Sequence, residues 1–512
     1  FPPAAVSLYQ WLWLLGGEPA ARAWRPWLFA FIARAVWALG AREGRPGAGL
    51  AAAGLFAASP LLVTNASQTT VDLELGLMVL LACLALRESR RGPSRGSWLA
   101  LGGAFAGAAA AIKYTAAFWA PGLALVAADP ANGSGRARAR RLGLFAAVAA
   151  LWVLPWMVRN ASAVGNPVYP YATRVFREGR QWDGPRHARF LTQQATYAVE
   201  RRADLVKLPW LLSIGNNSEN AIGPVLLLFA PLLLLRRFAA RGPGLYGAVA
   251  GFSLLAWMPV THIHRFLLPT WGLLGLLVAW HLCEVGDARP RLRDAALTLL
   301  LVVGAVNLAS VLTMWRSYLD LGNLLAGREA PAEYLGRKMV NSYYPAATSA
   351  GAALPRQARV AVVGETRGLY WPRPFLNQSA YDVGAFEETI RAARTPEEAA
   401  KRLKQRGVSH LFFNDAETSR LKNRFRYPQL EFTPYQRAVI AGLWGSWIDL
   451  GWSDPGRQEL YALRTAPRAR GVPPPPQPLS FDEEGLKRAF EGWSSITWQG
   501  GGDIQVRKEI QR

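Results

Sequence analysis

The sequence of 512 residues is short of charge, because only 18% of its residues are Asp, Glu, Lys or Arg while 51% are hydrophobic. A soluble protein of this length usually carries more charge, so a soluble fold throughout is not expected. Cysteine is also scarce, since Cys83 and Cys283 are the only two and both lie within or at the end of apolar stretches. We interpret them as free packing residues that say little about the redox compartment.

Acidic residues are fewer than basic ones, with 35 Asp and Glu against 58 Lys and Arg, and the formal net charge is +23. Such a charge can indicate nucleic-acid binding, but the sequence contains no pattern of a nucleic-acid-binding module. Much of the arginine lies in short connectors between apolar stretches, where it orients helices in a membrane and meets anionic lipid head groups. No nucleic-acid partner is therefore expected.

Apolar stretches separated by short connectors continue to about Leu312. This alternation predicts transmembrane helices, because a helix satisfies its own backbone hydrogen bonds in lipid. Several stretches are shorter than the roughly 20 residues of a perpendicular span, and flanking Trp and Arg can extend them into the interface. The predicted fold is a polytopic α-helical membrane protein with about ten visible spans, at 24–40, 47–63, 73–86, 98–112, 115–128, 142–158, 223–235, 243–259, 266–283 and 295–312.

The short connectors alternate in charge along the chain. The connectors at 63–72, at Lys113 and at Arg265 are nearly free of basic residues. The arginine-rich connectors between them mark the cytoplasmic side, so the long loop 159–222 and everything after Leu312 are expected outside. The arginine-rich set contains Arg42, Arg45, Arg87, Arg90, Arg91, Arg95, Arg136, Arg138, Arg140, Arg141, Arg236, Arg237, Arg241, Arg289, Arg291 and Arg293.

The same parity places Phe1 outside. Because the sequence starts there without Met and without a signal-peptide pattern, we expect at least one upstream transmembrane helix to be absent from it. Residues 1–20 form a short aromatic stretch that begins with Pro2-Pro3 and ends at Gly16-Gly17. We predict a helix lying at the outer interface, with a first full span as the alternative.

Polar residues gather at the predicted outer ends of the helices, where an ionisable group is a functional candidate. Asp72 and Glu74 lie on different faces of the third helix, so only one of them, with Asp72 favoured, can face the same cavity as its neighbours. Capping of the helix is the alternative role for Asp72. Lys113 follows a small-residue run suited to close helix packing, and its ammonium can reach water or hold a phosphate.

Two further clusters belong to this outer face. Arg159 precedes a segment with Asn166 and Tyr169, whose prolines indicate a rigid loop at the rim of a cavity or a simple interfacial anchor. His262 and His264 suggest a metal only weakly, because a third ligand is missing. Arg265 beside them is the better candidate, as a bidentate phosphate ligand.

This combination of cations and tyrosines with few acids suits an anionic lipid head group such as a polyprenyl phosphate. No acid lies in the middle of a predicted span, which argues against a proton relay. No cofactor is required by the sequence, and a divalent metal is left open.

The pattern changes after Leu312. Strands are predicted at 359–364, 409–414 and 459–463, with a helix from Thr395 to Arg406 between them, which indicates an α/β domain with parallel pairing. No dinucleotide glycine fingerprint follows the first strand. We therefore predict four parts, namely an outer interfacial segment at 1–20, a transmembrane domain at 21–312, an extracytoplasmic α/β domain at 313–465, and a Pro-rich linker with a polar tail at 466–512.

Six segments carry a family resemblance over roughly residues 1–464. They are, in order, AAIKYTA, RNASAVGNPVYPY, IGPVLLLFAP, RFLLPTWGLLGLL, VAVVGETRGLYW and LKQRGVSHLFFN. Together they resemble bacterial polyprenyl-phosphate-sugar glycosyltransferases, the GT-C-type membrane enzymes related to protein O-mannosyltransferases and aminoarabinose transferases. The resemblance implies a GT-C-like helical bundle, a bacterial inner-membrane location and a periplasmic C-terminal domain.

The resemblance also implies a mechanism in which a lipid-phosphate sugar donor binds at the outer face. Lys113 and Arg265 would be phosphate ligands, Tyr169 would line the cavity, and Arg159 and Asn166 would add substrate contacts. The family's catalytic base lies between its first two helices, which places it upstream of Phe1. Within this sequence Asp72 is the remaining, weaker candidate for a catalytic acid or base.

The expected partners are therefore a polyprenyl-phosphate sugar and membrane lipids. The alternative function is that of a non-catalytic accessory subunit of a larger membrane complex, built on a degenerate glycosyltransferase scaffold. A flippase or transporter would need discontinuous helices around a mid-membrane site, and the sequence shows no clear pair.

Overall fold

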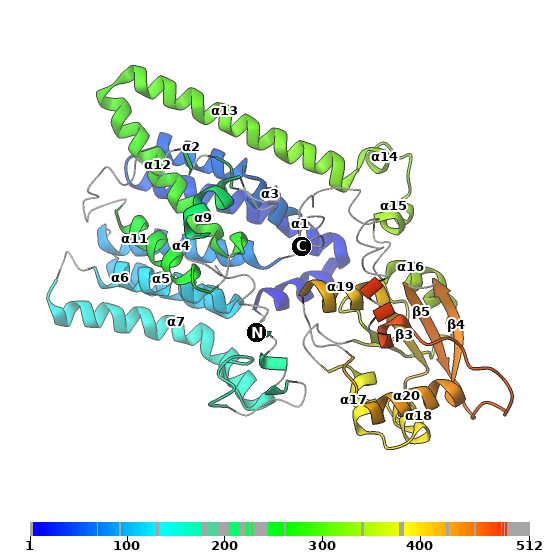
Figure 1. Cartoon of the computed structure of the whole chain (residues 1–512). Coiled ribbons are helices and arrows are strands. Elements are labelled where there is room, and N and C mark those ends of the chain that lie inside the picture. The colour runs from blue at the N-terminus through cyan, green and yellow to red at the C-terminus, as the bar shows by residue number, and fades with distance from the viewer. Residues whose placement is uncertain are drawn as a thin grey trace. The chain divides into compact units, whose positions relative to one another are not determined.

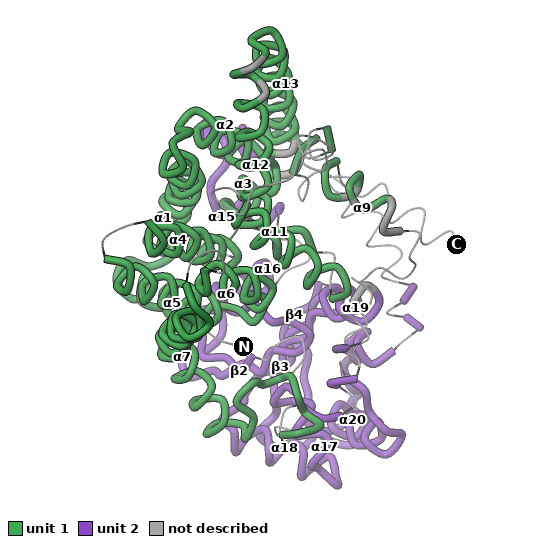
Figure 2. The backbone as a smooth tube through the Cα atoms, turned by 90° about the vertical axis from the view of Figure 1, so that its left-hand side faces the viewer, with its two compact units in different colours: residues 1–177, 194–319, 502–512 green, residues 178–193, 320–501 purple. Residues whose placement is uncertain are grey.

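A computed structural model of the chain describes most of the helices and the C-terminal sheet. The described residues are 4–68, 70–91, 94–129, 133–176, 182–184, 186–188, 190–191, 204–214, 222–224, 227–228, 244–260, 263–338, 343–377, 383–425, 430–454, 457–482, 484–485 and 487–488. The chain divides into two compact units (Figure 2). Unit 1 comprises 1–177, 194–319 and 502–512, and unit 2 comprises 178–193 and 320–501.

Unit 1 is helical in its described residues, and Figure 1 shows its long helices. The α-helices are α1 (Ala4–Arg42), α2 (Pro46–Ala57), α3 (Pro60–Ser67), α4 (Asp72–Arg91), α5 (Arg95–Ile112), α6 (Ala120–Ala128), α7 (Gly135–Val164), α9 (Asp204–Ser213), α11 (Gly244–Trp257), α12 (Leu268–Ala288) and α13 (Pro290–Met314). Short helical turns precede or follow three of them, at η1 (Tyr114–Phe118), η3 (His264–Leu267) and η4 (Trp315–Leu319).

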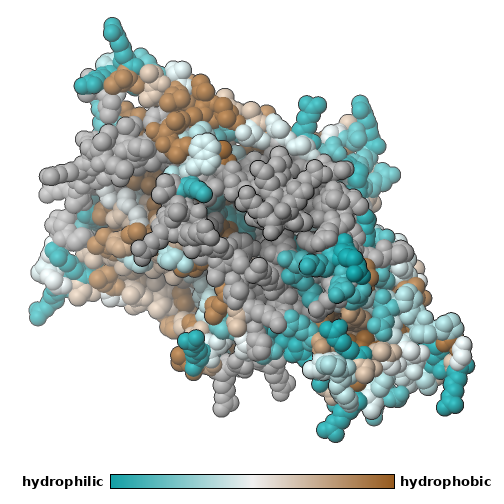
Figure 3. Space-filling view, viewed as in Figure 1, coloured by the Kyte–Doolittle hydropathy of each residue, from teal (hydrophilic) through white to brown (hydrophobic). Residues whose placement is uncertain are grey.

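Several of these helices are apolar enough for a membrane. By length and composition, the described residues contain three candidate spans, at Gly135–Val164, His264–Glu284 and Pro290–Ser317, and a fourth if the bent pair α2 and α3 is one span. Hydrophobic side chains gather on the surface of α13, as lipid contact requires (Figure 3). The structure thus confirms several apolar helices without confirming a count of ten, and the predicted span 223–235 lies mostly outside the described residues.

The predicted span at 47–63 is divided into two helices, α2 and α3. The chain bends by 61° between α2 and α3. Ser59 adopts an extended conformation there, its hydroxyl accepts a hydrogen bond from the Leu62 backbone N–H, and Pro60 occupies the first turn of α3. A proline at this position starts a helix readily but cannot continue the one before it. The span predicted at 115–128 likewise begins as the 3₁₀ turn η1 and becomes α-helical only at Ala120.

The N-terminal helix breaks where the sequence indicated. α1 loses helical geometry at Gly16 and Gly17, and Gly17 has a φ of +67°, which a residue without a side chain adopts at little cost. The part before the break exposes large apolar side chains, among them Trp11 and Leu15. This segment is therefore a separate short helix with an apolar surface.

Close packing of α5 holds the centre of unit 1 together. A Cβ atom on Gly103 would lie 2.6 Å from the Phe145 carbonyl oxygen of α7, and one on Gly107 would lie 2.3 Å from that of Ala149. These contacts are shorter than any side chain tolerates, so the two helices approach as closely as the small-residue run in α5 predicts. On its other side, α5 packs along α4, which carries the residues considered next.

Unit 2 contains a five-stranded sheet in the order β2-β1-β3-β5-β4. The strands are β1 (Val360–Val363), β2 (Phe375–Leu376), β3 (His410–Asn414), β4 (Ile448–Asp454) and β5 (Gln458–Leu463). The helices of this unit are α14 (Gly322–Leu325), α15 (Pro331–Lys338), α16 (Tyr344–Ala346), α17 (Ala385–Ala392), α18 (Pro396–Gln405), α19 (Asp415–Phe425) and α20 (Pro434–Trp447), with short turns at η5 (Ala347–Gly351) and η6 (Leu479–Phe481).

The predicted strands and helix of unit 2 are present, but the expectation of parallel pairing holds only in part. β1 pairs in parallel with β2 and β3, whereas β5 is antiparallel to both β3 and β4. The antiparallel part follows from the short connection between β4 and β5, which leaves room for a hairpin and not for a crossover helix. The sheet is therefore mixed.

Candidate functional site

Three charged residues from three helix ends meet in unit 1. Asp72 starts α4, Lys113 follows the last residue of α5, and Arg265 lies in η3 before α12. The Lys113 Nζ atom lies 2.7 Å from Asp72 Oδ1, and the Arg265 Nε atom lies 3.2 Å from Asp72 Oδ2. The sequence analysis selected all three residues separately, and the structure brings them together. We call this group the Asp72 cluster.

The Asp72 cluster is buried on its acidic side and open on its basic side. The Asp72 side chain is 4% exposed, whereas those of Lys113 and Arg265 are 22% and 37% exposed. The ring of Phe266 lies under both cations, with its centroid 3.7 Å from Lys113 Nζ. Burial of the ammonium lowers the pKa of Lys113, and the charge of Asp72 opposes that shift. Two cations with one carboxylate leave the cluster with a net charge of about +1.

The loop after α7 connects to this cluster through Tyr114, the neighbour of Lys113. The Tyr114 hydroxyl donates to the Tyr169 backbone carbonyl at 3.1 Å, and the Asn160 amide nitrogen lies 3.4 Å from that hydroxyl. The Tyr114 and Tyr171 rings meet edge to face, with centroids 5.5 Å apart. Tyr169 thus lies beside the residue that follows Lys113.

Asn166 shapes this loop from within. Its side chain is fully buried, its amide nitrogen donates to the Tyr171 carbonyl, and its oxygen accepts from the Val168 backbone N–H. Both ends of the amide are therefore occupied by the loop's own backbone. Such a pattern holds an irregular loop in one conformation.

The remaining candidates are not members of the Asp72 cluster, and one of them lies outside the described residues. The Arg159 side chain is exposed at the end of α7. His264 is the first residue of η3, and its backbone carbonyl accepts from the Trp271 indole. His262 lies outside the described residues. Among the described residues, no three His, Cys, Asp or Glu side chains gather as metal ligands would, and the metal hypothesis remains a prediction.

A second ionic group, which the sequence analysis missed, lies two residues further along α4, on a different face of the helix. Arg25 and Glu74 form an ion pair at 3.2 Å with side chains only 4% and 5% exposed. Tyr9 donates to the same carboxylate, and Arg25 also donates to the Thr70 and Asn65 carbonyls. An arginine at the outer edge of the predicted span 24–40 was the available signal, because such a residue needs a partner.

The sequence and the fold of this chain are similar to those of known proteins. Residues 10–158, which include Asp72 and Lys113, match the family model of dolichyl-phosphate-mannose-protein mannosyltransferases. A comparison with curated protein sequences finds no match.

Two solved structures of ArnT from Cupriavidus metallidurans share the fold. The apo structure matches with a TM-score of 0.51 and 17% identity over 90% of this chain and 87% of that one. The structure bound to undecaprenyl phosphate matches with a TM-score of 0.52 and 14% identity over 91% and 88%. The chain is thus similar to the GT-C-type glycosyltransferases of polyprenyl-phosphate sugars, in the sequence of its first helices and in its fold, and the resemblance expected from its sequence is confirmed.

Proposed function

We propose that the chain is an integral membrane glycosyltransferase that moves a sugar from a polyprenyl-phosphate carrier to an acceptor at the outer face of the membrane. The family match and the shared fold support the reaction class. The observation that carries the proposal is the Asp72 cluster, in which two partly exposed cations contact one buried carboxylate.

The charge of the cluster suits the donor. A polyprenyl-phosphate sugar is a phosphodiester with one negative charge, and the net charge of Lys113, Arg265 and Asp72 is about +1. Transfer breaks the bond between the sugar and the phosphate, so a second negative charge develops on the departing polyprenyl phosphate. Fixed cations stabilise that charge without reorganising, which is the main way in which such a site accelerates the reaction.

Within this proposal Asp72 is a positioning residue. Its carboxylate contacts both Lys113 and Arg265 and thereby holds their charged groups in place. Asn166 and Tyr114 hold the neighbouring loop, so that Tyr169 and Arg159 can border the donor. The alternation of arginine along the sequence supports unit 2 on the outer side of the membrane. The resemblance to bacterial members of the family supports a bacterial inner membrane.

The test is release of polyprenyl phosphate by the purified full chain, with a panel of polyprenyl-phosphate sugars as donors. Lys113→Ala and Arg265→Ala should each lower kcat about 100-fold or more, the effect of removing one donor from a charge-stabilising site. Arg174→Ala removes an exposed cation from the loop after α7 and is the matched control, which should keep turnover.

Turnover that survives both cluster substitutions would exclude the Asp72 cluster as the phosphate site. No turnover with any donor, from a protein that purifies only together with other membrane subunits, would favour the accessory-subunit function instead.

A further inference from the structure

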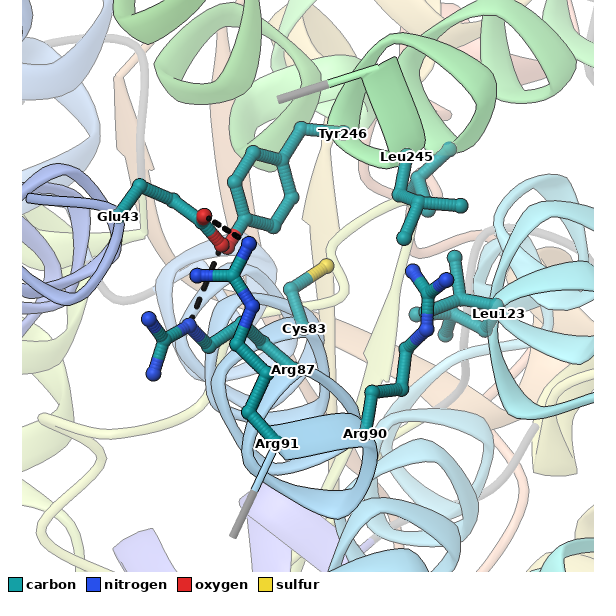
Figure 4. A pocket seen from close by; sticks show the side chains of 10 residues that line it. Glu43, Cys83, Arg87, Arg90, Arg91, Leu123, Leu245 and Tyr246 are labelled. Carbon is teal, nitrogen blue, oxygen red and sulfur yellow. Dashed lines mark hydrogen bonds and ion pairs between the residues drawn. The ribbon is translucent and has the colours of Figure 1, made fainter. Parts of the chain in front are cut away.

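A cavity of about 150 Å³ lies near the arginine-rich ends of the helices in unit 1 (Figure 4). Its polar side is formed by Glu43, the residue after α1, and by Arg87, Arg90 and Arg91 of α4. These arginines lie at the opposite end of α4 from Asp72, about 22 to 28 Å along the axis at a rise of about 1.5 Å per residue. The cavity is therefore separate from the Asp72 cluster.

Glu43 organises the polar side. Its side chain is 3% exposed, and Oε1 accepts from Arg87 Nε at 3.2 Å and from the Tyr246 hydroxyl at 3.0 Å. Its other oxygen, Oε2, pairs with Arg91 Nη2 at 3.0 Å. Figure 4 shows these groups converging on the carboxylate. One buried carboxylate thus holds two guanidinium groups at the cavity wall.

Each arginine of this wall pairs with a carboxylate. Arg90 pairs with Asp129 through Nη2 at 2.7 Å, and Arg87 pairs with Glu88 at 2.7 Å as well as with Glu43. Among the residues that line the cavity, Glu43 is the one carboxylate beside the three guanidinium groups. The Arg91 side chain is 49% exposed, and the ion pair with Glu43 occupies one of its two terminal nitrogens. Since a guanidinium has five N–H donors, Arg91 can hold a second anion without releasing Glu43.

The opposite wall is apolar. Leu123 and Val126 of α6 and Leu245 and Val249 of α11 line it. The cavity volume of about 150 Å³ is enough for one phosphate group. A site with arginines on one side and an apolar wall on the other matches a phosphate joined to a hydrocarbon chain, better than it matches a free anion in water.

We propose that this cavity binds the phosphate group of an anionic phospholipid at the arginine-rich ends of the helices. Arg91 and Arg90 hold the phosphate oxygens, Glu43 fixes the direction of Arg91, and the Leu245 wall receives the first part of the hydrocarbon. The lipid binds noncovalently at the opposite end of α4 from the Asp72 cluster. Its site therefore does not depend on the proposed glycosyltransferase function.

The experiment measures equilibrium binding of dioleoylphosphatidylglycerol to the full chain in detergent, with dioleoylphosphatidylcholine and inorganic phosphate as competitors. Arg91→Gln should weaken binding about fivefold and Arg91→Glu about 25-fold, because one basic side chain near a lipid phosphate contributes about 1 kcal/mol and 1.4 kcal/mol is tenfold. Arg140→Gln removes the same charge from an exposed position at the start of α7, and binding should not change.

Saturable binding that prefers phosphatidylglycerol, and that follows Arg91 but not Arg140, supports the proposal. Equal binding of phosphatidylcholine, or equal losses in the two variants, would overturn it in favour of a general surface charge. Displacement of the lipid by millimolar inorganic phosphate would overturn it in favour of a free-anion site. Because Arg91 is half exposed and Glu43 keeps its pair with Arg87, Arg91→Gln should keep the wild-type melting temperature, which checks that the fold is intact.

Discussion

Replacing Asp72 with Asn tests whether this carboxylate positions the two cations or takes part in proton transfer. The substitution keeps the shape of the side chain, and the amide oxygen can still accept from Lys113, whose Nζ atom lies 2.7 Å from Oδ1. What changes is charge, because the net charge of the Asp72 cluster rises from about +1 to about +2.

The magnitude follows from the geometry. A phosphate held by Lys113 and Arg265 at about 2.8 Å would lie about 5 to 6 Å from the Asp72 carboxylate on the far side of the cations. The repulsion between two unit charges at that distance is about 3 kcal/mol at an effective dielectric constant of 20. The cations are 22% and 37% exposed, so solvent screening lowers the repulsion to about 1 to 2 kcal/mol.

The expected result is therefore tighter binding of the product. Polyprenyl phosphate, with nearly two negative charges, should bind Asp72→Asn about tenfold more tightly than wild type, and the singly charged donor should gain less. If product release limits turnover, kcat and KM both fall, whereas Lys113→Ala should weaken product binding. Equilibrium binding of polyprenyl phosphate and steady-state kinetics measure both effects. Unchanged product affinity together with lost turnover would falsify the positioning role and assign Asp72 to proton transfer.

Three further predictions concern stability. Glu74→Gln should cost about 3 to 5 kcal/mol of unfolding free energy, because it leaves a buried arginine without its charge partner. Asp294→Asn, in an exposed pair of similar length, should cost about 1 kcal/mol at most, and equal losses in denaturant titrations would contradict the reasoning. Gly107→Ala should destabilise the protein by about 1 to 3 kcal/mol, whereas Gly143→Ala, with no atom near its added Cβ, should not lower the melting temperature. Burial lowers the pKa of His410, so the folded state binds this proton more weakly than the unfolded chain and stability should fall as the pH drops below about 6.5. In His410→Gln the urea midpoint should depend less on pH in this range, and an unchanged dependence on pH would contradict the prediction.

The helices and strands of this chain can be predicted where the local sequence carries a clear signal, such as an apolar run or a helix cap. The strand at Val360–Val363 is a continuous β-branched and apolar run, and the helix at Pro396–Gln405 has a threonine cap and a glycine just beyond its end. The break at Ser59-Pro60 was missed because the residues around it are apolar, so composition alone continues the span. β4 was missed because Gly451 and the polar residues of Ile448–Asp454 lack a strand pattern, and its pairing with β5 supplies what the sequence does not.

The members of the Asp72 cluster were predictable one by one because the alternation of basic and non-basic connectors places them on the same side of the membrane. Asp72, Lys113 and Arg265 each follow or start an apolar stretch on the side with few basic residues. Their mutual contacts were not predictable, since the distance from Asp72 to Lys113 depends on how α4 packs on α5 and the distance from Asp72 to Arg265 depends on how α4 packs on α12. Arg25 was overlooked because its partner Glu74 is separated from it by a bent helix pair that composition does not reveal.

The two carboxylates at the start of α4 have different roles because the cations that they contact differ in exposure. Asp72 and Glu74 are two residues apart, so they leave the helix on different faces, and each meets an arginine about 3.2 Å away. The side chains of Glu74 and its partner Arg25 are both at most 5% exposed. Arg25 also donates to two backbone carbonyls, so it presents no N–H group to solvent or to a ligand. Around Asp72 only the acid is buried, and its two cations keep open sides. A ligand phosphate can displace water from the Asp72 cluster. To contact Arg25 it would have to break the ion pair between Arg25 and Glu74. The same helix therefore fixes the fold with Glu74 and presents positive charge with Asp72, which is why the Asp72 cluster, and not the stronger buried pair, is the place to look for the reaction.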